Sequence, residues 1–439
     1  MKKVFFWSIT VAMGGFLFGF DTAVISGAEQ SIQQLWQLTD IYHGLAVAIA
    51  LYGTVIGALV GGIPADLFGR KKTLFWIGVL YLISAIGSAM APEIYSFMLL
   101  RFIGGLGVGA SSVVAPMYIS EVSPASQRGK LVALFQFNIV LGILIAYFSN
   151  YLMAGVGENA WRLMLGVEAI PATAFVILVT MVPESPRWLI IKRNNIEAAR
   201  KVFMAINPDG AEAALESVRK SDQDDVDKKT STRIFSSKYR FPVMLAFLFA
   251  FFNQVSGINA IIYYAPRIFD MTGLAKGSAL LSTIGIGVLN LIFTMVGMAI
   301  IDRFGRKTLM YIGSVGLVFA LAMVSRSFYM EQFTGVPVFL FAYIAFFAMS
   351  QGAVIWVFIA EIFPNRVRAA GQSLGSFTHW ILAALIANAF PFFVNKYDGG
   401  PIFLFFSVMM VVQLFFVWKI MPETRNATLE DLEKKLVRD

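Results

Sequence analysis

One carboxylate and one guanidinium interrupt apolar stretches of the sequence. Asp21 lies within GGFLFGFDTAVISG at 14–27, and Arg101 follows IYSFMLL at 94–100. Ionisable side chains in such stretches are costly, and they often mark an ion or proton pathway. A carboxylate beside a guanidinium stays ionised, whereas one separated from it in an apolar setting readily holds a proton. We therefore predict a proton-coupling pair, with a static structural ion pair as the alternative.

A second set of residues could bind a neutral, polyhydroxylated ligand, because amides donate and accept hydrogen bonds and aromatic faces stack on C–H surfaces. The first half of the sequence offers fewer of them than the second. The candidates for substrate binding are Phe18, Gln136, Asn253, Gln254, Asn259, Tyr263, Asn290, Gln351, Trp356, His379 and Trp380. The alternative is that the amides hold helices together.

A third set consists of charges near the expected span ends, together with Glu168 inside the sixth span. Its members are Asp66, Arg70, Glu121, Arg128, Glu168, Arg187, Asp302, Arg306, Glu361 and Arg368. One interpretation is ordinary loop chemistry. The other is a set of breakable ion pairs, each weak when exposed, that together bias a conformational equilibrium.

The elements that must position these residues are transmembrane helices. The chain has 439 residues, of which 58% are hydrophobic and 14% charged, and its mean hydropathy is +0.71. Continuous apolar runs of about 20 residues predict spanning helices rather than barrel strands. Twelve are expected, at 4–27, 42–63, 73–91, 95–119, 129–153, 161–182, 241–269, 276–301, 307–328, 336–363, 370–396 and 400–421.

The basic residues predict the orientation of the spans. They concentrate at 2–3, 70–72, 128–130, 183–240, 303–307, 366–368 and the C-terminal tail, all on one side of a twelve-span chain. This positive-inside pattern places both termini in the cytoplasm. It also argues that the charge of +8 does not mark a nucleic-acid binder.

Other classes of site and processing are disfavoured. The chain has no Cys and only His43 and His379, so a metal cluster is not expected, and neither a catalytic site nor a cofactor is predicted. Cleavage of the N-terminal segment as a signal peptide was weighed, but Asp21 breaks its apolar core.

With the first span rising from the cytoplasm, Asp21 lies about 25 Å above Val4, at about 1.5 Å per residue. Arg101 lies about 9 Å below the start of the descending fourth span, so the two reach similar depth in a core about 30 Å thick. Gly257 stands 236 residues after Asp21, so the second half has no acidic counterpart.

Three motifs recur and indicate duplication. DLFGRKK at 66 returns as DRFGRKT at 302, EVSPASQR at 121 as EIFPNRVR at 361, and PESPR at 183 as PETR at 422. We expect an N-terminal six-helix half at 1–182, a cytoplasmic linker at 183–240, a C-terminal half at 241–421 and a tail at 422–439. Short helices capped by Asn195 and Asp209 are expected in the linker, and SDQDDVDKKTSTR reads as mobile.

The chain resembles the sugar porter family of the major facilitator superfamily, especially its bacterial xylose–proton and glucose–proton symporters. The resemblance rests on DLFGRKK, RFIGGLGVGA, PESPRWL, NQVSGINAIIYYAP, DRFGRK and AEIFPNRVR. It implies the twelve-helix fold, sugar ligands at Gln136, Gln254 and Asn259, and an inner lock built from the repeated charges. It also implies proton coupling through Asp21 and Arg101, because facilitative relatives tend to lack the Asp.

The sequence departs from the family pattern at three places. Asn253 replaces a usual Gln, Gly352-Ala353 replaces a usual Gly-Pro, and His379 replaces a usual amide. These changes leave the sugar undefined and predict an altered bend in span ten.

We therefore predict an inner-membrane importer that carries one neutral monosaccharide, such as xylose, glucose or galactose, with one proton by alternating access. Its partners are the sugar, the proton and the lipid bilayer, with neither nucleic acid nor an obligate protein partner. A facilitative uniporter is the first alternative. A sugar sensor is the second, which the short tail of 18 residues after Met421 disfavours.

Overall fold

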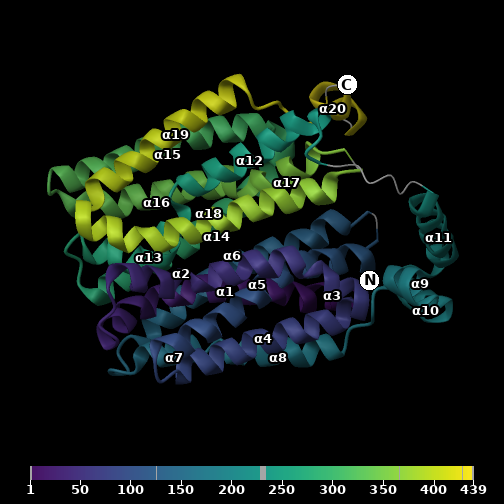
Figure 1. The fold of residues 1–439 in the computed structure, drawn as a ribbon, viewed down its shortest axis with the longest axis horizontal. Helices are drawn as coiled ribbons and strands as arrows, with labels where there is room; N and C mark the ends of the chain where they lie inside the picture. The colour runs from purple at the N-terminus through teal and green to yellow at the C-terminus, as the bar shows by residue number, and fades with distance from the viewer. Residues whose placement is uncertain (1, 125, 228–233, 365, 428, 438–439) are drawn as a thin grey trace. The chain divides into compact units, whose positions relative to one another are not determined.

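The computed structural model describes residues 2–124, 126–227, 234–364, 366–427 and 429–437. Within these residues, twelve segments are helical, long and apolar enough to cross a membrane (Figure 1). They match the twelve predicted runs, so the all-helical, polytopic fold class is confirmed.

The first six spans extend a few residues beyond the predicted apolar runs at most ends. Span two is followed by a separate short helix, and span six is interrupted near its middle. The helices are α1 Lys2–Leu35, α2 Asp40–Val60, α3 Gly62–Phe68, α4 Arg70–Met90, α5 Ile94–Val122, α6 Arg128–Met153, α7 Ala160–Gly166 and α8 Ala169–Thr180.

The last six spans contain two interruptions. Span seven begins with a short 3-10 turn at Ser237–Tyr239 and is broken after Val255. Span ten begins with another 3-10 turn at Phe333–Gly335 and is divided by a π-helical turn. The helices are α12 Arg240–Val255, α13 Ile258–Asp270, α14 Lys276–Phe304, α15 Arg306–Tyr329, α16 Val336–Phe347, the π-helical turn η4 Ala348–Gly352, α17 Ala353–Glu361, α18 Arg368–Tyr397 and α19 Gly399–Lys419.

The π-helical turn ends immediately before Ala353, at the position where the sequence departs from the family's Gly-Pro. One extra residue in a helical turn shifts the phase of the side chains that follow it. Gly313 of α15 allows the turn to pack closely, because a Cβ there would lie 1.9 Å from Ser350 Oγ. Span ten thus contains a π bulge just before Ala353, and the alteration of its bend relative to the family stays a prediction.

The described chain forms two compact units that do not follow the two sequence halves. Unit 1 contains residues up to Asp21, with Gly53–Ile143 and Leu165–Ser231. Unit 2 contains Thr22–Tyr52, Leu144–Met164 and the chain from Thr232 onwards. Unit 2 therefore includes the second ends of α1 and α6 and the first end of α2, all from the N-terminal half. The repeat-based division at 1–182, 183–240, 241–421 and 422–439 stays a prediction.

Helices pack side by side within each unit. In unit 1, α4 packs along α5 and α8. In unit 2, α15 packs along α19 and α16, and α12 packs along α18 (Figure 1). We call the span ends next to the two Asp-x-x-Gly-Arg-Lys copies the motif end, and the opposite ends the far end.

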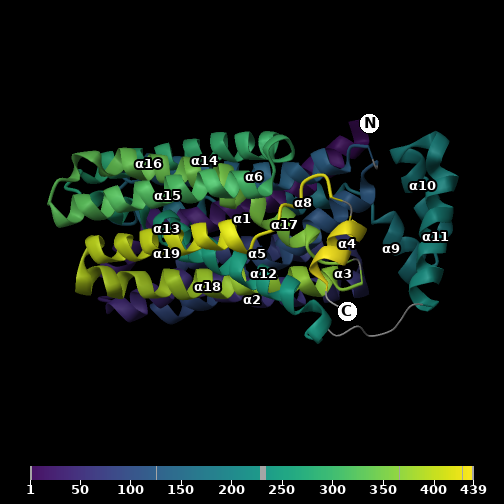
Figure 2. The same ribbon diagram turned by 90° about the horizontal axis from the view of Figure 1, so that it is seen from above.

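The linker contains the expected short helices, α9 Pro186–Arg193, α10 Ile196–Ile206 and α11 Ala211–Asp227, which lie together in Figure 2. The Asn195 side chain caps α10 as predicted, because its Oδ1 accepts from the Ala198 N–H at 3.0 Å. The predicted cap at Asp209 is wrong, since Asp209 lies inside a 3-10 turn at Pro208–Gly210.

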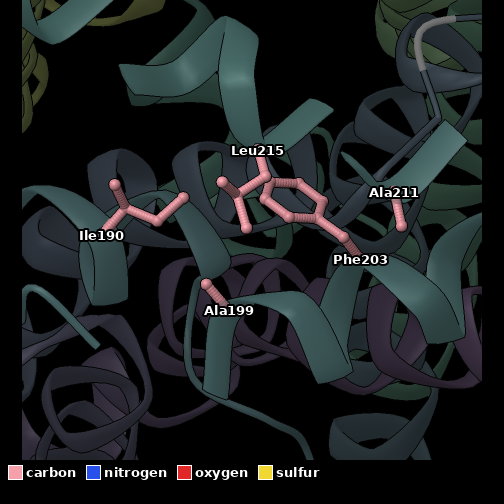
Figure 3. Packing of buried hydrophobic residues seen from close by; sticks show 5 residues of the cluster. All are labelled: Ile190, Ala199, Phe203, Ala211 and Leu215. Atoms are coloured by element: carbon pink, nitrogen blue, oxygen red, sulfur yellow. The ribbon is translucent and has the colours of Figure 1, made fainter. Parts of the chain in front are cut away.

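An apolar cluster holds these three linker helices together. Its buried members are Ile190, Ala199, Phe203, Ala211 and Leu215 (Figure 3). The segment predicted as mobile is helical over 221–227, where α11 continues, and its residues 228–233 lie outside the described chain.

One further helix follows the last span. It is α20 Leu429–Leu436.

Candidate functional site

Asp21 and Arg101 form an ion pair inside unit 1. The Nη1 of Arg101 donates to Asp21 Oδ1, and its Nη2 donates to the Asp21 carbonyl oxygen at 3.1 Å. Asp21 is 2% exposed and Arg101 is 1% exposed. The predicted depth match between α1 and α5 therefore corresponds to a direct, buried contact. A buried pair of this kind is costly to break, because either partner left behind is an uncompensated charge.

Glu168 adds a second carboxyl to this pair. It lies at the break between α7 and α8 and is 1% exposed. It forms a hydrogen bond with Asp21 and interacts electrostatically with Arg101. The prediction that Glu168 belongs to the cytoplasmic charges is wrong. Twelve residues separate it from Thr180 at the motif end of α8, which is about 18 Å of helix. Two buried carboxyls beside one guanidinium cannot both be compensated, so the site has capacity for a proton.

Other polar groups of unit 1 complete the surroundings of the pair. Tyr81 of α4 is buried and lies within electrostatic range of both Asp21 and Glu168, and it contacts Ser111 of α5. Gly104 of α5 leaves room beside Ser84, since a Cβ there would lie 2.3 Å from Ser84 Oγ and 3.7 Å from Asp21 Oδ1.

The break between α12 and α13 positions the amide residues of span seven. Gly257 adopts φ of 87°, a left-handed conformation that glycine tolerates, and α12 ends just before it at Val255. The Ser256 carbonyl next to this break accepts from Tyr343 Oη at 3.0 Å. Because a buried carbonyl needs a partner, this bond stabilises the interruption. Discontinuous helices are the usual source of midplane ligand groups in transporters.

Three amides and one histidine form a connected cluster around this break. Asn259 Nδ2 donates to Gln254 Oε1 at 2.6 Å. Gln254 Nε2 donates to Asn253 Oδ1 at 2.9 Å and lies 3.0 Å from His379 Nδ1. All four were predicted substrate ligands, and the structure brings them together in unit 2.

Two indole rings flank the histidine. The Trp356 ring centroid lies 5.0 Å from that of His379, and the Trp380 centroid lies 4.6 Å from it. Trp356 is 37% exposed, whereas Trp380 is buried. The cluster thus combines hydrogen-bonding groups with aromatic faces, as a sugar site requires.

The remaining predicted ligands lie apart from these contacts. Gln351, on the π-helical turn, donates to Gln413 Oε1 at 2.9 Å, and Gln413 donates to Ser314 Oγ at 2.9 Å. The structure therefore places Gln351 in a separate buried network. Asn290 accepts from Thr294 Oγ1 at 3.4 Å on α14, and Tyr263 is buried on α13.

Two candidates from the first sequence half belong to unit 1. Phe18 is buried on α1, and Gln136 is half-buried on α6. Their contribution to sugar binding stays a prediction.

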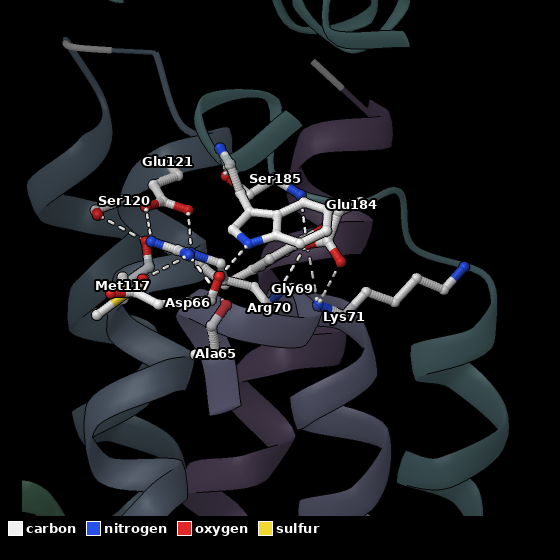
Figure 4. A network of polar contacts seen from close by, with 12 residues as sticks. Ala65, Asp66, Gly69, Arg70, Lys71, Met117, Ser120, Glu121, Glu184 and Ser185 are labelled. Carbon is white, nitrogen blue, oxygen red and sulfur yellow. Dashed lines mark hydrogen bonds and ion pairs between the residues drawn. The ribbon is translucent and has the colours of Figure 1, made fainter. Parts of the chain in front are cut away.

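The first copy of the repeated motif forms a charge network at the motif end of unit 1 (Figure 4). Arg70 Nη1 donates to Asp66 Oδ1 at 2.9 Å, and its Nε and Nη2 donate to the two oxygens of Glu121 at 3.1 Å each. Glu184 accepts from the backbone N–H groups of Arg70 at 2.9 Å and of Lys71 at 3.1 Å. One guanidinium and one turn therefore join α3, α4, α5 and the start of the linker.

The second copy repeats this network in unit 2. Arg306 Nη1 donates to Asp302 Oδ1 at 2.8 Å, and its Nε and Nη2 donate to Glu361 at 3.1 and 2.7 Å. Glu423 accepts from the backbone N–H groups of Arg306 at 3.0 Å and of Lys307 at 2.9 Å. The duplication seen in the sequence thus extends to the hydrogen-bond pattern.

Glu184 and Glu423 are members of the motif networks that the sequence interpretation missed. Both follow the repeated prolines Pro183 and Pro422, and this shared spacing was the available signal. Burial raises the pKa of the Glu184 carboxyl, while the backbone hydrogen bonds from Ser185, Lys71 and Arg70 oppose that rise.

The other predicted lock residues make contacts within their own unit. Arg128 Nε donates to the Ser120 carbonyl at 3.1 Å, and Arg368 Nε donates to the Phe363 carbonyl at 3.3 Å. Arg187 is exposed at the start of α9. A lock formed between the halves stays a prediction.

Among the described residues, no group of three or more His, Asp or Glu side chains is placed to hold a metal ion. The main polar clusters of the described chain are the Asp21 pair with Glu168, the amide cluster, the Gln351–Gln413 network, the two motif networks and a far-end cluster around Glu29 described below.

Comparison with known proteins places this fold in a family. The chain matches the family model for sugar (and other) transporters over residues 7–436. It is 36% identical over 436 residues to the D-xylose transporter of Levilactobacillus brevis, which covers 97% of this chain and 94% of that protein. It is 34% identical over 448 residues to the arabinose–proton symporter of Bacillus subtilis (strain 168), covering 100% and 96%.

The solved inward-open structure of the xylose transporter XylE from E. coli has the same fold. It matches with a TM-score of 0.88 at 34% identity and covers 99% of this chain and 100% of that one. These matches run through both copies of the motif network and through the broken span seven, so they concern the whole architecture and not a fragment. The chain is thus a multi-pass membrane protein of the sugar transporter family within the major facilitator superfamily, and it is a transporter and not an enzyme.

Proposed function

We propose that the protein imports a neutral monosaccharide together with a proton by alternating access across the inner membrane. The observation that carries this proposal is the buried group formed by Asp21, Arg101 and Glu168 in unit 1. A conformational change that moves Arg101 relative to the carboxyls would change their capacity for a proton.

The orientation follows from the distribution of basic residues. The motif end carries the Lys and Arg clusters, so we place it, with both termini, in the cytoplasm. The far end then faces outwards. Within this topology, the motif networks lie where a cytoplasmic lock would act.

The amide cluster supports a neutral sugar as the substrate. Its hydrogen-bonding groups are Asn253, Gln254, Asn259 and His379, and the flanking indoles offer faces for the sugar ring. An anionic substrate would require a cation in this cluster, and none of these four residues supplies a fixed one. The named substrates of the relatives, xylose and arabinose, are neutral pentoses.

A uniporter with a structural Asp21–Arg101 pair is the second candidate, because a buried ion pair alone is compatible with a static role. A sugar-induced pH change in proteoliposomes separates the candidates. A symporter alkalinises the medium when sugar is added outside, whereas a uniporter carries sugar without that change. A sensor transports no sugar and produces no pH change. Transport of sugar with no proton movement at any imposed gradient would exclude the symport proposal.

A further inference from the structure

The far end of unit 2 contains a buried charge cluster that the proposed function does not use. Glu29 of α1 is 0% exposed. Arg267 of α13 donates to both of its oxygens, at 3.0 Å from Nε to Oε1 and 2.8 Å from Nη2 to Oε2. Arg267 Nη2 also donates to Gln33 Oε1 at 2.6 Å. This bidentate geometry is the strong form of an ion pair.

A histidine shares the same carboxylate. His43 of α2 is 0% exposed, and its Nε2 lies 2.7 Å from Glu29 Oε2. Glu29 and His43 come from the N-terminal half of the sequence, whereas Arg267 comes from the C-terminal half. Glu29 therefore contacts His43 from the first half of the sequence and Arg267 from the second half.

Polar contacts around the cluster join the same helices. Gln30 Nε2 donates to Asp270 Oδ2 at 2.8 Å, and Asn395 Nδ2 of α18 donates to Asp40 Oδ1 at 2.5 Å. Gly44 of α2 permits very close packing, since a Cβ there would lie 1.9 Å from the Asn388 carbonyl of α18. The far ends of α1 and α2 are thus closed against α13 and α18.

We propose that Glu29, Arg267 and His43 form a latch on the outer end, and that protonation of His43 releases it. This inference rests on the proposed alternating-access cycle, in which α1 and α13 must separate on the outside. Separation removes Arg267 from Glu29 but leaves His43 beside it. A buried carboxylate without a cation is costly. Protonation of His43 places a cation beside Glu29 and therefore stabilises the open state.

The proton comes from the outer solution and returns to it on closure, so the latch senses pH without carrying a proton across. Other charged or titratable groups face the cluster: Asp40 of α2, Tyr264 and Asp270 of α13, and Lys276 of α14. In the closed state, a charged His43 would compete with Arg267 for one carboxylate. Lower external pH therefore favours the outward-open state.

The test measures the distance between spin labels on the full-length protein in lipid nanodiscs. The sequence has no Cys, so Leu35→Cys and Ala275→Cys provide a clean pair at exposed positions of α1 and at the start of α14. We expect the distribution to shift to longer distances as the pH falls from about 8 to about 5. Glu29→Gln and Arg267→Gln should shift it to longer distances at every pH.

His43→Gln is the decisive variant, because an amide can still donate to Glu29 but cannot titrate. It should keep the closed distribution and lose the pH response. Glu158→Gln, at an exposed far-end carboxylate, is the matched control and should behave as the unmodified protein does. The series is repeated with Asp21→Asn, and the pH response should persist there.

Three outcomes would overturn the latch. They are unchanged distances in both Glu29→Gln and Arg267→Gln, a pH response that survives in His43→Gln, and a response that disappears with Asp21→Asn alone. Sugar-binding measurements identify any variant that fails to fold. If Arg267→Gln or Glu29→Gln fails to fold, the other variant alone serves as the test. The readout involves neither sugar nor proton flux, so failure of symport in liposomes is a separate result.

Discussion

Gln254 Nε2 lies 3.0 Å from Nδ1 of His379 and donates at 2.9 Å to Asn253 Oδ1. Both amide protons of Gln254 are therefore engaged before any ligand arrives. Its Oε1 is engaged as well, because it accepts from Asn259. Gln254 Nε2 also lies 3.2 Å from Nε2 of His379, so the groups left to meet sugar hydroxyls are the Asn253 amide N–H and the second amide proton of Asn259. The cluster is preorganised by its own hydrogen bonds, which lowers the ordering cost of binding.

Gln254→Ala and Asn259→Ala should each weaken sugar binding. Each removes ligand-facing or ligand-orienting hydrogen bonds, which corresponds to about 1–2 kcal/mol, or roughly 5- to 30-fold in Kd. Isothermal titration of the purified protein with a panel of neutral pentoses and hexoses measures the effect. Gln351→Ala is the matched control, because that amide lies in the separate network with Gln413 and Ser314. Equal losses in all three variants would argue against a local site.

His379→Gln should retain more sugar affinity than His379→Ala. A glutamine offers both an acceptor for Gln254 Nε2 and a donor, whereas alanine leaves the Gln254 N–H without its partner. Removing a buried partner costs about 1–3 kcal/mol. The same titrations, together with the fluorescence of the neighbouring Trp356 and Trp380, provide the readout. An alanine variant that binds as tightly as the glutamine variant would exclude the orienting role.

Glu184→Gln and Glu423→Gln should destabilise the protein to a similar extent. Each glutamine replaces one acceptor oxygen by a donor amide, which opposes a backbone N–H of the Gly-Arg-Lys turn. The expected loss is about 1–3 kcal/mol for one buried donor left unpaired. Thermal unfolding in detergent measures it, with the exposed Glu197→Gln as control. If only one of the two variants is destabilised, the networks are not equivalent.

The apolar runs predict the twelve spans, although the first helix continues to Leu35 and not to residue 27. The rise per residue predicts that Asp21 and Arg101 lie at similar depth, and their direct contact comes from the structure. The sequence does not reveal the Glu29–Arg267 pair. Those residues lie near span ends, where a charge is ordinarily a loop charge, and their meeting depends on how α1 and α13 approach each other. Glu168 was grouped with the charges of the cytoplasmic span ends because it is acidic, although it lies well inside span six.

The direction of individual side chains is the second feature that could not be predicted from the sequence. Gln351 was predicted at the sugar site, yet the π-helical turn that carries it directs it to Gln413. A one-residue change of helical phase cannot be predicted from composition. Glu184 and Glu423 were missed because they bind backbone N–H groups, and their signal in the sequence is only the repeated Pro-Glu pair.

Arg128→Ala or Arg368→Ala should shift the sugar-free protein toward inward-facing states. Each arginine approaches the carbonyl of a neighbouring turn, Ser120 or Phe363, and a lock between the halves would require such a cation near each motif network. Several weak pairs acting together bias the equilibrium, so one substitution should impair transport and leave sugar binding intact. Label-to-label distances across the cytoplasmic ends test this, with exposed Lys192→Ala as control. Unchanged distributions would count against the lock.

Glu168→Gln should alter proton coupling without abolishing sugar binding. The variant keeps hydrogen bonding to Asp21 but removes one of the two buried carboxyls beside Arg101. With a single carboxyl left, one guanidinium faces one carboxylate, and the proton capacity of the buried group changes. Gradient-driven uptake should therefore persist with an altered pH dependence. The pH profile of concentrative uptake measures the shift, and a profile identical to that of the unmodified protein would leave Glu168 a structural neighbour.

Asp21→Asn removes the titratable group with little change in volume, and it is the sharpest test of coupling. If Asp21 carries the proton, the variant loses accumulation of sugar against a gradient and loses sugar-driven alkalinisation. Sugar binding should survive, because the connected amide cluster belongs to unit 2 and Asp21 to unit 1. Exchange of sugar between two equal pools should also survive, since it moves no net protons.

Arg101→Ala should fail in a different way from Asp21→Asn. It leaves Asp21 and Glu168 buried without their cation, so both carboxyls favour the protonated form in every conformation and the carrier cannot release its proton. The measurement is concentrative uptake in liposomes under an imposed pH gradient, with Glu158→Gln as the exposed-carboxylate control. Full accumulation by Asp21→Asn would show that Asp21 is only the structural partner of Arg101, and another group would then have to carry the proton.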